Sequence, residues 1–274
     1  MEKMLFFNSN LIISSNYYDI IGSNNYLMAR EYFSISLIYN QTDLFYAIIS
    51  AIVGFYLLIL LLIMKKSPFP IWITRKTVHF LGGTYIAFII NFINSLWGVI
   101  LSALFFGMVF LILVFASKFQ ILNEYFVLKE CRENERNFTF LFNTVSTLLS
   151  LLILFIVFNG FPGVFMAGAL IISWADTSGE VVGKNLPFIK YKIFNKKTIS
   201  GTIAVFLSSI ISFLVTIKFC EFFYDNVNFT TPWFWKIIIG SILCALMESL
   251  SWKWFDNILL PFCGGITILW LYFS

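Results

Sequence analysis

Two carboxylates stand out between residues 174 and 202, in a chain with few charges. Asp176 and Glu180 are four residues apart, so they would share one face of a helix. Mg²⁺ prefers oxygen ligands and commonly takes one or two carboxylates, with phosphate oxygens and water completing its shell. We therefore expect Asp176 and Glu180 to hold Mg²⁺ and to take part in catalysis.

The segment that follows carries groups that bind anions. Ammonium, hydroxyl and backbone N–H donors at a helix start suit phosphate binding; the residues concerned are Lys196, Lys197, Thr198 and Gly201. No P-loop pattern is present, so a nucleotide would not be held in the P-loop manner. Ala175, Gly179 and Gly183 recur every four residues, a spacing that also indicates close helix packing.

Basic residues mark two further segments. Arg75, Lys76 and His79, the only histidine, lie within one helical turn. They would form a phosphate clamp or simply set the membrane topology. Arg132 and Arg136 are either a solvated charge run or part of a phosphate-binding rim. We take both groups as candidate nucleotide-binding residues.

A last polar group lies near the C-terminus. Glu248 follows an apolar run that carries no charge after Lys236, and Asp256 and Asn257 come next. A carboxylate in apolar surroundings is ionised when it is paired with a cation or a metal. We expect Glu248 to act in catalysis and all three residues to orient a nucleotide or metal.

Composition indicates a polytopic membrane protein. Of 274 residues, 59% are hydrophobic and 12% are charged, and the mean hydropathy is +0.87, whereas soluble domains carry about 25% charged residues. The four cysteines lack paired zinc spacing, so we read them as small apolar residues. No nucleic-acid partner is expected, and the oligomeric state is left open.

Uncharged runs predict an all-α bundle of about eight transmembrane helices, because a bilayer core needs about 20 apolar helical residues. Tight turns are expected near residues 91–95 and at 159–163, where polar residues, glycine and proline interrupt two long runs. The expected spans are 44–64, two within 77–116, two within 137–175, 198–217, 232–252 and 257–273.

The distribution of basic residues predicts the topology. The loops 65–76, 117–136, 176–197 and 253–256 hold 14 of the 18 lysine and arginine residues, so we assign them to the cytoplasm. Both termini would then lie on the non-cytoplasmic side. Residues 1–42 are expected to form an extramembrane or interfacial extension, and residues 43–274 a membrane-embedded domain.

These motifs together resemble the polyprenol kinase family, which includes dolichol kinase, phytol kinase and the CTP-dependent diacylglycerol kinases. The core of the resemblance is Asp176-Thr177 through Gly183, followed by Lys197-Thr198-x-x-Gly201-Thr202. Arg75-Lys76-x-x-His79 and Glu248 with Asp256-Asn257 and Pro261 match in the same order. The chain departs from the family at Phe255, where a second Asp often stands.

The resemblance implies transfer of the terminal phosphate of CTP, or of another nucleoside triphosphate, to the hydroxyl of a membrane-embedded alcohol. The acceptor would be a long-chain isoprenoid alcohol such as dolichol, polyprenol or phytol, and the membrane that of the endoplasmic reticulum or the plasma membrane. Phosphoryl transfer mainly needs positioning and neutralisation of phosphate charge. The carboxylates would therefore hold Mg²⁺ or accept a proton, and the basic residues would bind the phosphates.

Two other functions compete with this interpretation. A phosphatidate cytidylyltransferase also has an Asp before a small-residue helix and a Lys-Lys-Thr-x-x-Gly stretch, but its further His-Gly-Gly and Asp-Arg-x-Asp segment is missing here. A transporter would carry its charged residues at a midplane site. The expected crowding of charge at one interface argues against transport.

Overall fold

The computed structural model describes residues 41–67, 70–93, 95–116, 137–158, 161, 163–192, 196–224, 229, 233–251 and 255–272. Residues 1–40 of the expected N-terminal extension lie outside this part. The candidates Arg132 and Arg136 do so as well, and of Lys196 only the backbone is described.

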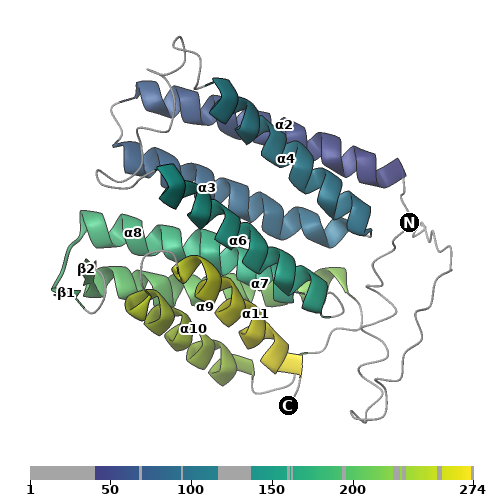
Figure 1. Ribbon diagram of the computed structural model, residues 1–274. Coiled ribbons are helices and arrows are strands. Elements are labelled where there is room, and N and C mark those ends of the chain that lie inside the picture. Colours follow the sequence, from purple (N-terminus) through teal and green to yellow (C-terminus); the bar gives the residue numbers. More distant parts are fainter. Residues whose placement is uncertain are drawn as a thin grey trace.

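The described chain is a bundle of helices (Figure 1), which confirms the expected mostly helical class. The helices are α2 (Gln41–Lys66), α3 (Ile71–Ile89), α4 (Leu96–Ala116), α6 (Asn137–Phe158), α7 (Val164–Leu170), α8 (Asp176–Asn185), α9 (Ile199–Phe223), α10 (Trp233–Leu250) and α11 (Asp256–Tyr272). A 3₁₀ turn, Ile90–Phe92, follows α3, and a π-helical stretch, Ile171–Ala175, joins α7 to α8.

Each expected span overlaps one of these helices, but the second span expected within 137–175 corresponds to α7, which is seven residues long and runs into the π-helical stretch. Both expected turns fall between helices. At the second turn Gly163 has φ 84°, a left-handed conformation that glycine adopts without steric cost. Among the described residues, three helices are long and apolar enough to cross a membrane: Gln41–Met64, Ile199–Phe223 and Trp233–Leu250. The number of about eight spans and the side of the termini stay predictions.

The expected loop 176–197 is largely regular structure. Helix continues from the π-helical stretch through α8 to Asn185, so Asp176 and Glu180 stand on one helix, as their spacing predicts. Strands β1 (Lys190–Lys192) and β2 (Lys196–Thr198) then pair antiparallel, a small departure from an all-α chain. These strands are three residues long and lysine-rich, so they lack the alternation that identifies a strand.

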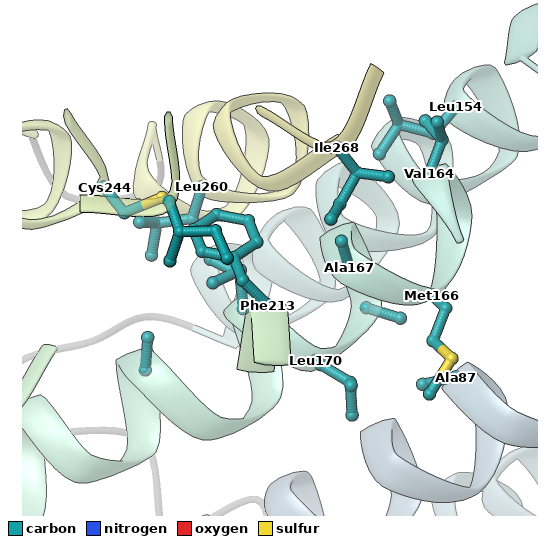
Figure 2. Packing of buried hydrophobic residues seen from close by; sticks show 14 of the residues in the cluster. Ala87, Leu154, Val164, Met166, Ala167, Leu170, Phe213, Cys244, Leu260 and Ile268 are labelled. Atoms are coloured by element: carbon teal, nitrogen blue, oxygen red, sulfur yellow. The ribbon is translucent and has the colours of Figure 1, made fainter. Parts of the chain in front are cut away.

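Helix α7 lies at the centre of the hydrophobic core, packed against α3, α6, α9 and α11. All its residues except Phe165 are buried, and around it gather side chains such as Leu154, Phe213, Leu260 and Ile268 (Figure 2). A Cβ at Gly168 would come within 2.9 Å of the Pro261 carbonyl oxygen. This close approach holds α11 against α7. The segment that follows α7 along the chain leads to Asp176.

A second close contact joins α8 to α9. A Cβ at Gly201 would lie 2.8 Å from the Gly179 carbonyl oxygen, and one at Gly183 would lie 2.8 Å from Thr198 Oγ1. The small-residue stripe therefore serves as a helix-packing surface. As a result, the glycine face of α8 packs on the start of α9, and the carboxylates of Asp176 and Glu180 meet basic residues of α3 instead.

Candidate functional site

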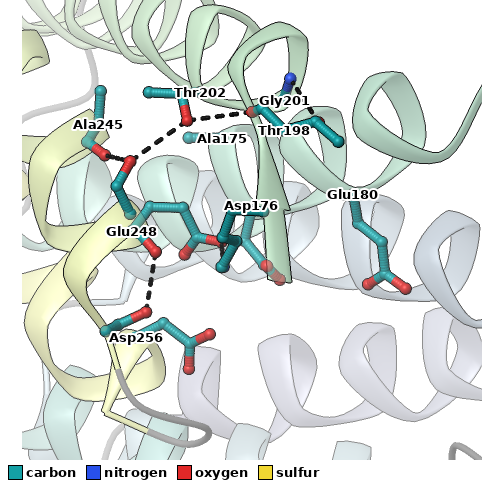
Figure 3. A network of polar contacts seen from close by, with 12 residues as sticks. Ala175, Asp176, Glu180, Thr198, Gly201, Thr202, Ala245, Glu248 and Asp256 are labelled. Atoms are coloured by element: carbon teal, nitrogen blue, oxygen red, sulfur yellow. Dashed lines mark hydrogen bonds and ion pairs between the residues drawn. The ribbon is translucent and has the colours of Figure 1, made fainter. Parts of the chain in front are cut away.

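Three carboxylates from three helices converge at one end of the bundle. Asp176 begins α8, Glu248 stands in the last turn of α10, and Asp256 begins α11. One oxygen of each lies within 4.8 Å of the others, and Figure 3 shows the three near one another with Glu180 set apart. Carboxylates this close repel one another unless cations offset their charge, so the arrangement suits a divalent cation.

The donor set fits a hard divalent ion such as Mg²⁺, which prefers oxygen ligands. Glu248 is 7% exposed, and its Oε2 is buried without a hydrogen-bond partner among the described residues. Leaving such an atom unsatisfied costs about 1–3 kcal/mol. A bound cation would satisfy it.

Two lysines border the carboxylate cluster. Lys76 Nζ donates to Asp176 Oδ2 at 2.6 Å and lies 3.0 Å from Glu180 Oε2. Lys197, on β2, forms an ion pair with Glu248 Oε1. Lys76 precedes Asp176 by 100 residues and Lys197 follows it by 21, so only folding brings the two ammonium groups to the same site.

Glu180 lies in a different environment from Asp176, although both stand on α8. Its carboxylate accepts from Arg75 at 3.1 Å and from Lys184 at 2.5 Å, and it also contacts Lys76. It is not one of the three clustered carboxylates. Glu180 therefore holds basic side chains in place at the edge of the cluster.

These contacts set the pKa values of the charged side chains on α8 and in the hairpin. Both elements lie outside the three helices that are long and apolar enough to cross a membrane. Burial alone would raise the pKa of the Glu180 carboxyl, but Lys76, the hydrogen bond from Lys184 and Arg75 together lower it. Burial would also raise the pKa of Asp176, but Lys76 and His79 together lower it. Burial lowers the pKa of the Lys197 ammonium, but Glu248 reverses the effect and holds it above its usual value. All three groups are charged at neutral pH.

His79 supports the start of α8 through the π-helical stretch. Its Nε2–H donates to the Ile172 carbonyl oxygen at 3.1 Å and lies 3.6 Å from Asp176 Oδ2. A π-helical turn leaves carbonyl groups available for such contacts and is frequent at functional sites. His79 thus links α3 to the segment that orients Asp176.

A cluster of three hydroxyl groups includes Ser249, which follows Glu248 on α10. Tyr191 Oη on β1 lies 2.6 Å from Thr202 Oγ1 on α9 and donates to Ser249 Oγ on α10 at 2.9 Å. The Thr202 and Ser249 oxygens are 3.2 Å apart. We call Tyr191, Thr202 and Ser249 the hydroxyl cluster; it fastens the hairpin to both helices.

The remaining candidates lie at the helix starts around the site. Thr198 is the N-cap of α9 and accepts from the Gly201 N–H, so that N–H already has a partner. The Asn257 carbonyl oxygen accepts from Ser150 at 3.0 Å. It is available because Pro261, four residues on, has no N–H to bond it.

Sequence reasoning did not single out Lys184, Tyr191 or Ser249. The spacing of Glu180 and Lys184 is a helical ion-pair signal, and it could have identified Lys184 on the helix that Asp176 and Glu180 predict. Tyr191 and Ser249 carry no such signal, because their contacts join segments 58 residues apart.

Comparison with known proteins gives one informative match. The chain is 24% identical over 131 residues to CTP-dependent diacylglycerol kinase 1 of Eremothecium gossypii, a region that covers 43% of this chain and 41% of that kinase. No protein-family model and no solved structure matches the chain. The match supports the resemblance to lipid kinases that the motifs indicate.

Proposed function

We propose that the protein is a membrane lipid kinase that transfers the terminal phosphate of CTP to a hydroxyl group of a membrane lipid. The observation that carries this proposal is the cluster of Asp176, Glu248 and Asp256 with Lys76 and Lys197 at its border. Phosphoryl transfer is catalysed by positioning and by neutralising phosphate charge. Carboxylates that suit a cation, beside fixed ammonium groups, provide both.

The chain's own residues would act as follows. Lys76 and Lys197 bind the nucleotide phosphates, and His79 keeps Asp176 oriented through Ile172. The acceptor oxygen bonds to the γ-phosphorus while the bond to the β–γ bridging oxygen breaks, so CDP leaves. The hydroxyl proton passes to a carboxylate oxygen of the cluster that does not hold the cation.

A divalent cation would be held by Asp176, Glu248 and Asp256, where it would neutralise charge on the phosphates. This revises the sequence-based pairing of Asp176 with Glu180. The three basic partners of Glu180 lower its pKa and make it a weak proton acceptor, so we assign it to holding Arg75 and Lys76. Gly201 is assigned to helix packing, because its N–H is already bonded.

The acceptor is proposed to be a single-hydroxyl lipid at the cytoplasmic face of the membrane. Long-chain isoprenoid alcohols are the first candidates, following the motif resemblance. Diacylglycerol is the second, because the similar kinase of Eremothecium gossypii is named for it. Both present one hydroxyl at the interface and an apolar body to the bilayer.

Labelled CTP tests the proposal directly. Membranes containing the protein are incubated with γ-labelled or α-labelled CTP and each acceptor, and the lipids are extracted. A kinase transfers label only from γ-labelled CTP. Label from α-labelled CTP alone would identify a cytidylyltransferase, and no labelled lipid from either nucleotide would contradict both enzymatic functions.

A further inference from the structure

An apolar groove runs between α9 and α10 beside the candidate site. It is lined by Thr202, Ile203, Phe206, Ile242, Ala245 and Leu246, presents only apolar surface, and has a volume of about 340 Å³. Small-molecule sites span about 300–1,000 Å³. The groove is therefore large enough for part of a hydrocarbon chain.

The groove lies at the same end of the helices as the carboxylates. Its residues on α9 belong to the first two turns, and those on α10 belong to the last turns before Glu248. Both helices are long and apolar enough to cross a membrane, and Ile203, Ile242 and Leu246 are about half exposed. A chain in the groove would thus remain in contact with bilayer lipid.

The groove is continuous with the polar site through Thr202 and Ala245. Thr202 lines the groove and bonds through its hydroxyl within the hydroxyl cluster. The Ala245 carbonyl oxygen accepts from Ser249, the neighbour of Glu248. One end of the groove therefore meets hydroxyl groups at the turn of α10 that carries Glu248.

We propose that this groove binds the hydrocarbon chain of the lipid alcohol acceptor. The inference rests on the proposed function and specifies where the acceptor lies. An alcohol keeps its hydroxyl at the interface while its chain avoids water. With the chain between α9 and α10, the hydroxyl reaches the hydroxyl cluster and lies next to Glu248.

Groove-filling variants of the full-length protein test this placement. Leu246→Trp fills the groove, whereas Leu243→Trp, on the same helix and similarly exposed, does not line it. Leu246→Trp is expected to raise the apparent KM for the alcohol about tenfold, the scale at which a pocket discriminates one methylene, with the KM for CTP unchanged. Leu243→Trp is expected to match the wild type.

A photoreactive long-chain alcohol supplies a readout that does not depend on turnover. Adducts are expected on the first turns of α9 and the last turns of α10, competed by unlabelled alcohol and lost in Leu246→Trp. Competed labelling there without phosphorylation would support the groove while contradicting the kinase. Phosphorylation with labelling that is not competed, or that persists in Leu246→Trp, would overturn the groove alone.

Discussion

Tyr191 lies directly opposite Lys197 in the hairpin, and both side chains reach neighbouring residues of α10. Tyr191 binds Ser249, and Lys197 binds Glu248. The hairpin is therefore fastened to the end of α10 at two adjacent points. This arrangement keeps the Lys197 ammonium beside the carboxylate cluster, and it makes Tyr191 a positioning residue for Lys197.

Replacing the tyrosine hydroxyl should loosen that arrangement. Tyr191→Phe removes the hydrogen bonds to Thr202 and Ser249, each worth about 1 kcal/mol. We expect kcat to fall about fivefold to thirtyfold and Tm to fall by only a few degrees, measured by γ-phosphate transfer and thermal unfolding. A fall in Tm with unchanged kcat would make Tyr191 a stabilising residue only.

Neutralising Asp176 should abolish transfer. In Asp176→Asn the cluster loses a charge, and Lys76 loses its closest partner. We expect a rate loss of about 1,000-fold or more, comparable to losing a group that neutralises transition-state phosphate charge. Glu221→Gln is the matched control, because that carboxylate pairs with Lys218 on the surface. Normal turnover of Asp176→Asn would remove Asp176 from the mechanism.

Metal binding distinguishes the clustered carboxylates from Glu180. Mn²⁺ binding to detergent-solubilised protein, followed by electron paramagnetic resonance, should weaken at least about 10- to 100-fold in Glu248→Gln and in Asp256→Asn, as when a metal site loses an anchoring group. Glu180→Gln should leave the affinity nearly unchanged. The opposite order would restore Glu180 as the second ligand.

Glu180 should contribute stability that depends on pH. Its pKa is lowered on folding, so its contribution is present above the unfolded pKa of about 4.3. The contribution is lost as pH falls toward the lower folded value. The Tm difference between wild type and Glu180→Gln should be largest near neutral pH and shrink below about pH 4. A difference independent of pH would show that the ion pairs are not its source.

The contact between α8 and α9 should not tolerate a methyl group. Gly201→Ala would bring a Cβ within 2.8 Å of a backbone oxygen of Gly179, and overpacking costs about 1–3 kcal/mol. We expect a Tm several degrees lower by scanning fluorimetry. Gly107→Ala is the control, because nothing lies within 4 Å of that added carbon; equal Tm values for the two variants would contradict the packing role.

The sequence by itself determined the helices and most of the candidate residues. Uncharged runs coincide with helices because bilayer thickness demands long apolar segments. The breaks at 91–95 and at Gly163 follow from polar residues and from backbone freedom. Local spacing also placed Asp176 and Glu180 on one helix, since such patterns depend only on helical period.

Only the tertiary structure decided which charged groups meet. Asp176 joins Glu248 and Asp256, whereas Glu180, one turn later, is surrounded by basic side chains. The hairpin and its tyrosine were also not readable from the sequence. Contacts between distant segments depend on how helices pack and cross, and a small shift in packing sends neighbouring side chains on one helix to different partners.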